Sequence, residues 1–281
     1  MSEARVAVVI PCWNDGATLE QTLESVRHQE SCEIVVVDDG STDPATIELM
    51  ERLPQRGISV IRQSNRGAAA ARMAAVAATY GRYVLPLDAD DLLTPGALTE
   101  LADALDATPE EALVWGDQIT FGDAEIYMRT AAALDPWWIT YENRLPMTSL
   151  IRRHHLELAG GWSLGEGYED WDLWMSFAER GFTGHRIPFV TLRYRLHGSR
   201  LYDAGRKRHD EHVARLERRH ATLLAARREN RKRSTAPLRL RLLLPVVWAL
   251  PVSRLTKTRI GHLLSVPRRV FDARLARLKR A

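Results

Sequence analysis

Short β-rich runs alternate with helical segments through the first 116 residues, and this alternation limits the possible folds more than any other feature of the chain. The β-rich runs are largely apolar, which is typical of strands that are buried on both faces. The pattern therefore predicts an α/β fold with a mostly parallel central sheet and helices on both faces. The runs cover residues 5–10, 33–38, 58–63, 82–87 and 112–116, and the helical segments cover 17–29, 44–53, 67–80 and a stretch after Thr94-Pro95.

The charge of the chain divides it into two parts after Gly205. Residues 206–281 contain 22 Lys/Arg and 5 Asp/Glu, whereas residues 1–205 contain 17 and 31. We therefore expect an acidic α/β domain over 1–205 and a basic, helical C-terminal extension over 206–281, each with its own partners. The extension begins with a long Arg-rich helical pattern over 206–233. An apolar stretch over 238–252 follows, which two prolines interrupt and which is too short to span a membrane.

The composition of the extension favours a membrane surface as its partner. Arginine alternates with Leu, Val and Trp in amphipathic stretches, including 266–280, which suits an anionic lipid surface better than nucleic acid. The alternative is that the extension packs on the domain or on a second subunit, as in a homodimer. Cys12 and Cys32 form no disulfide or zinc pattern, and the N-terminus has no cleavage site. These features predict a cytoplasmic protein, peripheral on the inner face of the cell membrane.

Carboxylates gather where the predicted strands end. The carboxyl ends of parallel strands face a common crevice, where ligands bind. Asp88 and Asp90 follow the fourth strand and are two positions apart, so in an extended segment they point the same way. Oxygen ligands of this kind suit Mg²⁺ or Mn²⁺ bound together with a polyphosphate. Asp15, Asp43 and Asp91 are equally compatible with turns and helix caps.

Five segments of the chain resemble the family 2 glycosyltransferases of GT-A type, a Rossmann-like fold, in both order and spacing. They are VVIPCWND, VVVDDGSTD, SNRGAAAAR, LPLDADD and GYEDWDLW, and the resemblance covers about residues 5–200. It implies an inverting enzyme that uses a nucleotide sugar, with a UDP-sugar favoured, and a glycan or lipid-linked glycan as acceptor. The chain has no QxxRW-like motif and no membrane-spanning run, so we expect a non-processive enzyme of cell-surface polysaccharide or glycoconjugate assembly.

The resemblance also implies roles for individual residues around the donor. A carboxylate at the ends of the first two strands can accept hydrogen bonds from the base or the ribose. An arginine on the Ala-rich helix approaches the nucleotide, and the DAD carboxylates, with a histidine in YRLHGS, hold the metal. The assignments are Pro11, Asn14, Asp38, Asp39, Arg72 and Asp88 for the donor, and Asp88, Asp90 and His197 for the Mn²⁺ or Mg²⁺ ion.

The GYEDWDLW segment supplies the predicted catalytic base. Inverting transfer is a single displacement in which the acceptor hydroxyl loses its proton to a positioned carboxylate. The family pattern places this base on the Asp of the Glu-Asp pair, so Asp170 is the candidate, with a helix cap as its alternative role. Glu169 and Trp171 are assigned to the acceptor. Trp137, Trp138 and Trp162 either stack on a sugar or belong to the core, and a core position is favoured for Trp174.

Two other functions compete with this interpretation. A sugar-phosphate nucleotidyltransferase would need a Gly-rich, basic phosphate loop after the first strand, where this chain has PCWNDG. A carbohydrate-binding relative without catalytic activity would not need the intact DAD and ED pairs. Relatives with these motifs use several donors, and we expect the choice of acceptor to depend on residues 117–168.

Overall fold

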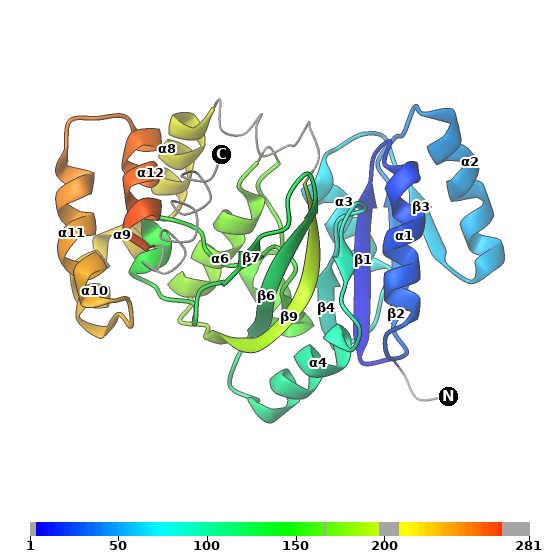
Figure 1. Cartoon of the computed structure of the whole chain (residues 1–281), viewed down its shortest axis with the longest axis horizontal. Coiled ribbons are helices and arrows are strands. Elements are labelled where there is room, and N and C mark those ends of the chain that lie inside the picture. Colours follow the sequence, from blue (N-terminus) through cyan, green and yellow to red (C-terminus); the bar gives the residue numbers. More distant parts are fainter. Residues whose placement is uncertain (1–3, 166, 197–207, 266–281) are drawn as a thin grey trace, which may run out of the picture.

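The computed structural model describes residues 4–165, 167–196 and 208–265. Within these ranges the core is one nine-stranded sheet with the order β3-β2-β1-β4-β8-β6-β9-β5, and β7 pairs with β6 at the side (Figure 1). The strands are β1 Val6–Cys12, β2 Glu33–Asp38, β3 Ser59–Arg62, β4 Tyr83–Pro86, β5 Leu92–Leu93, β6 Leu113–Gly122, β7 Tyr127–Met128, β8 Leu150–Arg152 and β9 Gly184–Leu196.

The sheet is mixed, with a parallel half that confirms the prediction from sequence. Strands β3, β2, β1 and β4 run parallel, and β6 and β9 run parallel to each other. Strand β8 lies between β4 and β6 and is antiparallel to both. The sequence did not predict β5, β7 or β8, because segments of two or three residues carry no periodic pattern.

Helices cover both faces of the sheet, as expected. Neighbouring residues of β1 point to opposite faces, so Val9 joins an apolar cluster with α3 and α6, and Val8 joins one with α1, α2 and α4. Asp43 caps α2, because its Oδ2 accepts a hydrogen bond from the backbone N of Thr46 at 2.8 Å. These helices are α1 Gly16–Arg27, α2 Pro44–Arg52, α3 Ala68–Ala77, α4 Ala97–Ala107, α5 Arg153–Ala159 and α6 Glu169–Glu179.

The C-terminal extension packs on the α/β domain at one end of the molecule, beside α6 (Figure 1). In its described part, residues 208–233, the Arg-rich pattern contains three short helices rather than one long helix. Leu240 and Leu244 are fully buried in a cluster with Trp137 and Tyr141. No helix in the described ranges combines the length and apolarity needed to cross a membrane. The extension helices are α8 His209–Arg219, α9 Ala221–Ala225, α10 Arg227–Arg233, α11 Leu238–Ala249 and α12 Arg254–Ser265.

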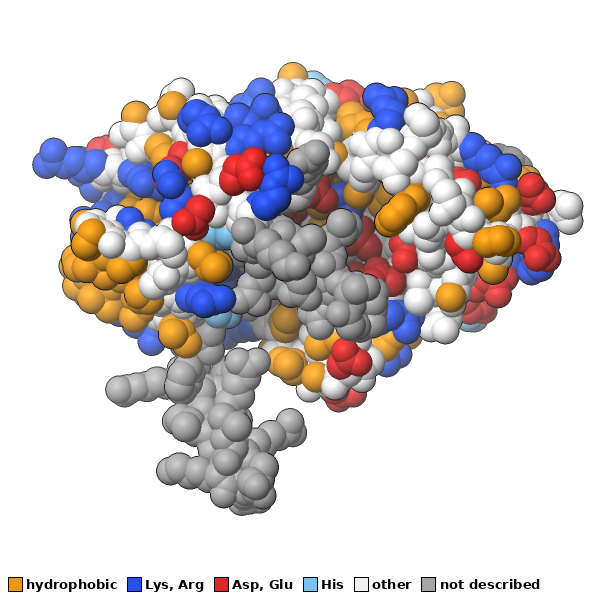
Figure 2. All heavy atoms as spheres, turned by 90° about the horizontal axis from the view of Figure 1, so that it is seen from above, with side chains coloured by type: hydrophobic (Ala, Val, Ile, Leu, Met, Phe, Trp, Pro, Cys, Tyr) orange, Lys and Arg blue, Asp and Glu red, His pale blue; other side chains and the backbone are white. Residues whose placement is uncertain are grey.

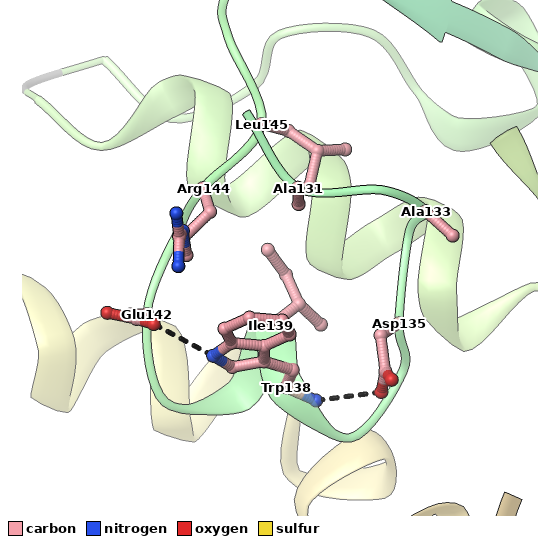
Figure 3. A pocket seen from close by; sticks show the side chains of 8 residues that line it. All are labelled: Ala131, Ala133, Asp135, Trp138, Ile139, Glu142, Arg144 and Leu145. Carbon is pink, nitrogen blue, oxygen red and sulfur yellow. Dashed lines mark hydrogen bonds between the residues drawn. The ribbon is translucent and has the colours of Figure 1, made fainter. Parts of the chain in front are cut away.

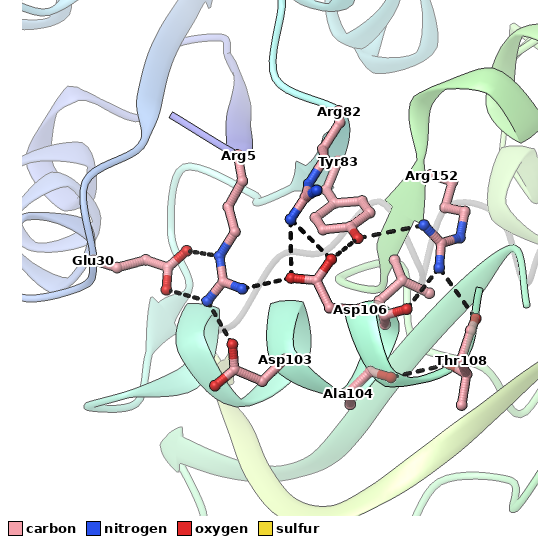
Figure 4. Close-up of polar contacts among 10 residues, drawn as sticks. Arg5, Glu30, Arg82, Tyr83, Asp103, Ala104, Asp106, Thr108 and Arg152 are labelled. Carbon is pink, nitrogen blue, oxygen red and sulfur yellow. Dashed lines mark hydrogen bonds and ion pairs between the residues drawn. The ribbon is translucent and has the colours of Figure 1, made fainter. Parts of the chain in front are cut away.

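A network of charged side chains ties the strands together at the edge where β1 and β4 begin (Figure 4). Arg5 pairs with Glu30, Asp103 and Asp106. The guanidinium group of Arg152 donates to three backbone carbonyl oxygens, those of Leu105 at 2.6 Å, Thr108 at 3.1 Å and Glu111 at 2.7 Å. These bonds fasten β8 to the last turn of α4 and to the segment after it, far from the carboxyl ends of the parallel strands.

We expect Arg152→Ala to lower the free energy of unfolding by about 2–3 kcal/mol, because three carbonyl groups lose a charged donor. Urea unfolding followed by circular dichroism measures the change. The matched control is Arg82→Ala, since Arg82 belongs to the same network but its side chain is 59% exposed. Its loss should cost less than about 1 kcal/mol. Equal losses for the two variants would contradict a special role for the carbonyl contacts of Arg152.

Candidate active site

The loops after β1 and β2 form one unit, and Asn14 joins them. Asn14 has a φ of 60°, a left-handed conformation that asparagine tolerates better than most residues. Its Oδ1 accepts hydrogen bonds from the backbone N of Thr42 at 2.8 Å and of Asp43 at 2.9 Å, and its own backbone N donates to Ser41 Oγ at 3.0 Å. Pro11 is buried at the end of β1. The structure therefore brings together the two motifs that the sequence assigns to the base and the ribose of the donor nucleotide.

Asp39 holds the loop that leads into α3. Its Oδ1 accepts hydrogen bonds from the backbone N of Arg66 at 2.9 Å and from Gln63 Nε2 at 2.7 Å. Its Oδ2 accepts one from the backbone N of Gly67 at 2.8 Å. Asp38 lies beside it at the end of β2 and is also buried. Both carboxylates thus shape the rim on which the predicted donor site depends.

Arg72 connects three motifs that are far apart in the sequence. Its side chain is 3% exposed, and its Nη2 lies 2.6 Å from Asp88 Oδ1. Its Nη1 lies 3.1 Å from Glu169 Oε1. Arg72 comes from α3, Asp88 from the segment after β4, and Glu169 from the first turn of α6. The ion pairs place the predicted donor arginine, the DAD motif and the predicted base motif at one location.

The carboxyl group of Asp170, the predicted base, lies among groups that shift its pKa. Its carboxylate is half-buried in the first turn of α6, next to Glu169. Asn143 Nδ2 donates to Asp170 Oδ2 at 2.7 Å, and the backbone N of Trp171 donates to Oδ1 at 2.7 Å. Burial, with the negative charge of Glu169 as the second cause, raises the pKa of Asp170 to about 7. A base with such a pKa is well matched to proton abstraction at physiological pH.

The raised pKa of Asp170 predicts how stability depends on pH. Between about pH 4 and pH 7 the folded chain retains a proton that the unfolded chain has released, so the free energy of unfolding falls as the pH rises through this window. The Asp170→Asn variant lacks this contribution. Between pH 5 and pH 8 the free energy of unfolding should fall in both proteins. We expect the decrease to be about 2 kcal/mol smaller in the variant than in the wild type. Denaturant titrations at the two pH values, with EDTA present, measure the difference, and identical pH dependence would contradict the assignment.

The second aspartate of the motif, Asp172, fastens α6 to the C-terminal extension. It is 1% exposed. His220 Nε2 lies 3.0 Å and Arg219 Nε 2.8 Å from Asp172 Oδ1, and His220 Nδ1 lies 2.9 Å from Glu179 Oε2. Burial opposes ionisation of Asp172, but the bonds from His220 and Arg219 outweigh it and lower the pKa of this carboxyl. No local motif points to Arg219 or His220, although the opposite charges of domain and extension indicate such contacts.

The carboxylates of Asp88 and Asp90 are open enough to serve as metal ligands. The Asp88 side chain is 38% exposed, and Asp90 is partly exposed. Their oxygens are the donor type that Mg²⁺ and Mn²⁺ prefer, so the two residues would fit such an ion together with phosphate oxygens of a bound nucleotide. The predicted third ligand, His197, lies outside the described residues. Within the described ranges no three His, Cys, Asp or Glu side chains are grouped to hold a metal ion.

Arg195 fixes the DADD loop, a role that the sequence did not reveal. Its Nε donates to the backbone O of Asp90 at 2.7 Å. Its backbone N donates to Asp91 Oδ1 at 2.8 Å. Asp91 is 1% exposed and serves local structure, as the alternative interpretation expected. Because Arg195 lies on β9, about a hundred residues further along the chain, no local pattern connects it with this loop.

The structure places Trp171 in the core rather than at an open acceptor surface. Trp171 is 5% exposed, and its indole Nε1 donates to the backbone O of Ile139 at 2.7 Å. Its ring is therefore enclosed by protein, which corrects the assignment of this side chain to the acceptor. Trp137, Trp162 and Trp174 are buried as well. By contrast, Trp13 is 51% exposed next to Asn14, and it presents an aromatic surface that no sequence motif indicated.

The crevice around Trp138 is structural (Figure 3). Its volume of about 10 Å³ is at most enough for one water molecule, so it has no room for a sugar. Trp138 Nε1 donates to Glu142 Oε1 at 2.8 Å, and the backbone N of Trp138 donates to Asp135 Oδ1 at 3.0 Å. Asp135 Oδ2 also accepts a hydrogen bond from Ser234 Oγ at 2.7 Å. The first two bonds hold segment 131–145 together, and the bond from Ser234 fastens this segment to the extension.

The family of the chain follows from a comparison with known proteins. Residues 7–161 match the model of glycosyl transferase family 2, so the chain belongs to this family of transferases. The uncharacterized protein y4gI of Sinorhizobium fredii is 29% identical over 238 residues, which cover 75% of this chain but 25% of the relative. Chondroitin synthase of Escherichia coli is 28% identical, with coverages of 69% and 29%. The putative teichuronic acid biosynthesis glycosyltransferase TuaG of Bacillus subtilis is 28% identical, with coverages of 68% and 79%.

Solved structures confirm the fold. The S. aureus TarS 1–349 structure in complex with UDP superposes with a TM-score of 0.61 at 17% identity, covering 92% of this chain and 87% of that one. The mannosyltransferase PcManGT of Pyrobaculum calidifontis, in complex with GDP-Man and Mn²⁺, superposes with a TM-score of 0.61 at 20% identity, covering 100% and 82%. The architecture is thus the GT-A fold that the sequence motifs predict.

Proposed function

We propose that the chain is a metal-dependent, inverting glycosyltransferase. It would move a sugar from a nucleotide-sugar donor, with a UDP-sugar favoured, to a hydroxyl group of a glycan or lipid-linked glycan. The observation that carries this proposal is the joining of Asp88, Arg72 and Glu169 next to Asp170, whose pKa is about 7. The names of relatives such as TuaG and chondroitin synthase support a role in polysaccharide assembly.

The donor would lie on the rim formed by the loops after β1, β2 and β4. Pro11, Asn14, Asp38 and Asp39 shape the part assigned to base and ribose, and the exposed ring of Trp13 offers a surface on which a base can stack. Arg72 keeps Asp88 oriented from its buried position. Relatives of this fold bind UDP, UDP-GlcNAc or GDP-Man, which supports a nucleotide sugar as the ligand of this rim.

A Mg²⁺ or Mn²⁺ ion would be held by Asp88 and Asp90, with His197 as the predicted further ligand. When bound, such an ion supplies positive charge that stabilises the departing diphosphate. Two arginines of the chain hold these carboxylates in place. Arg72 does so through its ion pair with Asp88, and Arg195 does so through the backbone of Asp90.

Asp170 would act as the general base. The acceptor oxygen forms a bond to the anomeric carbon while its proton passes to a carboxylate oxygen of Asp170. The bond from the anomeric carbon to the phosphate oxygen breaks in the same step, and the nucleoside diphosphate leaves. One displacement of this kind inverts the configuration of the sugar. Asn143 orients the base through its 2.7 Å hydrogen bond, and Glu169 raises the proton affinity of Asp170.

Calorimetric titration with UDP and GDP, with and without Mn²⁺, tests the proposal at the level of binding. We expect one nucleotide to bind and Mn²⁺ to strengthen its binding, and Asp90→Asn to remove the effect of the metal. A chain that binds neither nucleotide would instead support the carbohydrate-binding alternative. Release of pyrophosphate from a nucleoside triphosphate and a sugar phosphate would support the nucleotidyltransferase.

A further inference from the structure

Helix α11 carries large aliphatic side chains on its inner and its outer side, with Arg239 and Arg241 among them. On the inner side Leu240 and Leu244 are fully buried and Val247 is 8% exposed, and the first two pack against Trp137 and Tyr141. On the outer side the large aliphatic residues are between 41% and 63% exposed. We call these the outer face of α11. It consists of Leu238, Leu242, Leu243 and Val246, and Leu250 and Val252 continue it beyond the end of the helix.

A helix with large aliphatic residues on opposite sides is normally buried on both of those sides. The outer face of α11 departs from this rule, since no described part of the chain encloses it. Exposed aliphatic side chains that adjoin one another are typical of interaction sites. Figure 2 shows hydrophobic side chains gathered at the end of the molecule where α11 lies in Figure 1. The outer face of α11 is therefore a candidate contact surface for a partner with an apolar component.

The charge around this face identifies the kind of partner. Residues 227–265 contain ten Lys or Arg and a single acidic residue, Glu229. Figure 2 shows Lys and Arg side chains on the same end of the molecule as the hydrophobic cluster. Exposed basic side chains include Arg228, Arg239 and Arg259. A partner that is both apolar and negatively charged matches this combination.

We propose that the outer face of α11 docks on an anionic membrane surface. Leu242, Val246 and their neighbours would enter the boundary between headgroups and acyl chains, while Arg228 and Arg239 contact lipid phosphates. Because the inner face packs on the domain, the helix would lie in the plane of the interface and bring the domain to the surface. The sequence predicted a membrane partner for the whole extension, and this proposal assigns the contact to one helix face. It does not depend on the transfer reaction, because only the exposure and charge of this face support it.

Flotation of the full chain with lipid vesicles tests this proposal. We expect the wild type to float with vesicles of phosphatidylcholine and phosphatidylglycerol at low salt, and to float less with phosphatidylcholine alone or at high salt. Leu242→Glu combined with Val246→Glu should lower the bound fraction at least about tenfold. The matched control is Leu158→Glu on α5, because Leu158 is 52% exposed but lies outside the outer face of α11. This control should float like the wild type.

Three results would overturn the proposal. The first is a wild type that does not float, and the second is a double variant that floats as well as the wild type. The third is a wild-type dimer in sedimentation that becomes monomeric in the double variant, which would show that a second copy covers the face. Circular dichroism melting checks that the double variant is folded, and an Arg228→Gln/Arg239→Gln variant should bind anionic vesicles more weakly. If the variants that do not float still bind nucleotide, the proposed transferase function is unaffected by the loss of membrane binding.

Discussion

Asp170→Asn is expected to reduce the rate of sugar transfer at least about 10³-fold while the dissociation constant of the donor changes by less than about twofold. The amide of asparagine has nearly the same shape as the carboxyl group but does not take up a proton at neutral pH. Donor contacts are assigned to other residues, so binding should persist. Initial rates with a saturating acceptor and calorimetry with the donor nucleotide separate the two effects.

The pH dependence of the rate distinguishes a base from a merely structural carboxylate. The wild-type rate should rise about tenfold per pH unit below pH 7 and level off above it, since only the ionised form of Asp170, whose pKa is about 7, accepts a proton. In Asn143→Ala, Asp170 loses a bond that favours its ionised form, so the midpoint should move upward. A rate in Asp170→Asn that equals that of the wild type at any pH would remove Asp170 from the mechanism.

Arg72→Met is expected to impair both stability and transfer. The substitution leaves the carboxylates of Asp88 and Glu169 without their buried cation. Removing one partner of a buried ion pair is strongly destabilising, and because Asp88 is partly exposed we expect a loss of about 2–3 kcal/mol in the free energy of unfolding. The transfer rate should fall at least about 100-fold, because the orientation of Asp88 is lost.

A double variant separates these two consequences of losing Arg72. Adding Glu169→Gln to Arg72→Met removes one of the uncompensated charges, so about half of the lost stability should return. Transfer should remain impaired, because Asp88 still has no arginine to orient it. Recovery of activity together with stability would show that Arg72 acts only through the fold.

The parallel half of the sheet was predictable because each strand carries its own signal. The run at 33–38 matches β2 residue for residue, and α2 begins at Pro44 after its Asp43 cap. Strand β8 was not predictable, since its three residues look like any short apolar segment and are placed by pairing with β4 and β6. The Arg-rich pattern over 206–233 predicted helix but not its division into α8, α9 and α10.

In the site, too, residues within sequence motifs were predictable, whereas residues that are placed by distant parts of the chain were not. The family resemblance assigned Arg72 and Asp88 to the donor and Glu169 to the acceptor, and the ion pairs of Arg72 show that the fold brings these three residues together. The supporting residues Asn143 and Arg195 escaped notice, because single polar residues in otherwise unremarkable segments give no pattern. Trp171 was misplaced because its position next to Asp170 suggested the acceptor, whereas the period of α6 turns its ring into the core.

The most direct test of the account measures nucleoside diphosphate release from UDP-, GDP- and dTDP-sugars by the full chain with Mn²⁺ present. We predict that at least one donor is turned over above its background rate. The same donor should bind to Asp170→Asn and release no nucleoside diphosphate above background. Absence of turnover with all three donors, or turnover by Asp170→Asn at the wild-type rate, would contradict the account.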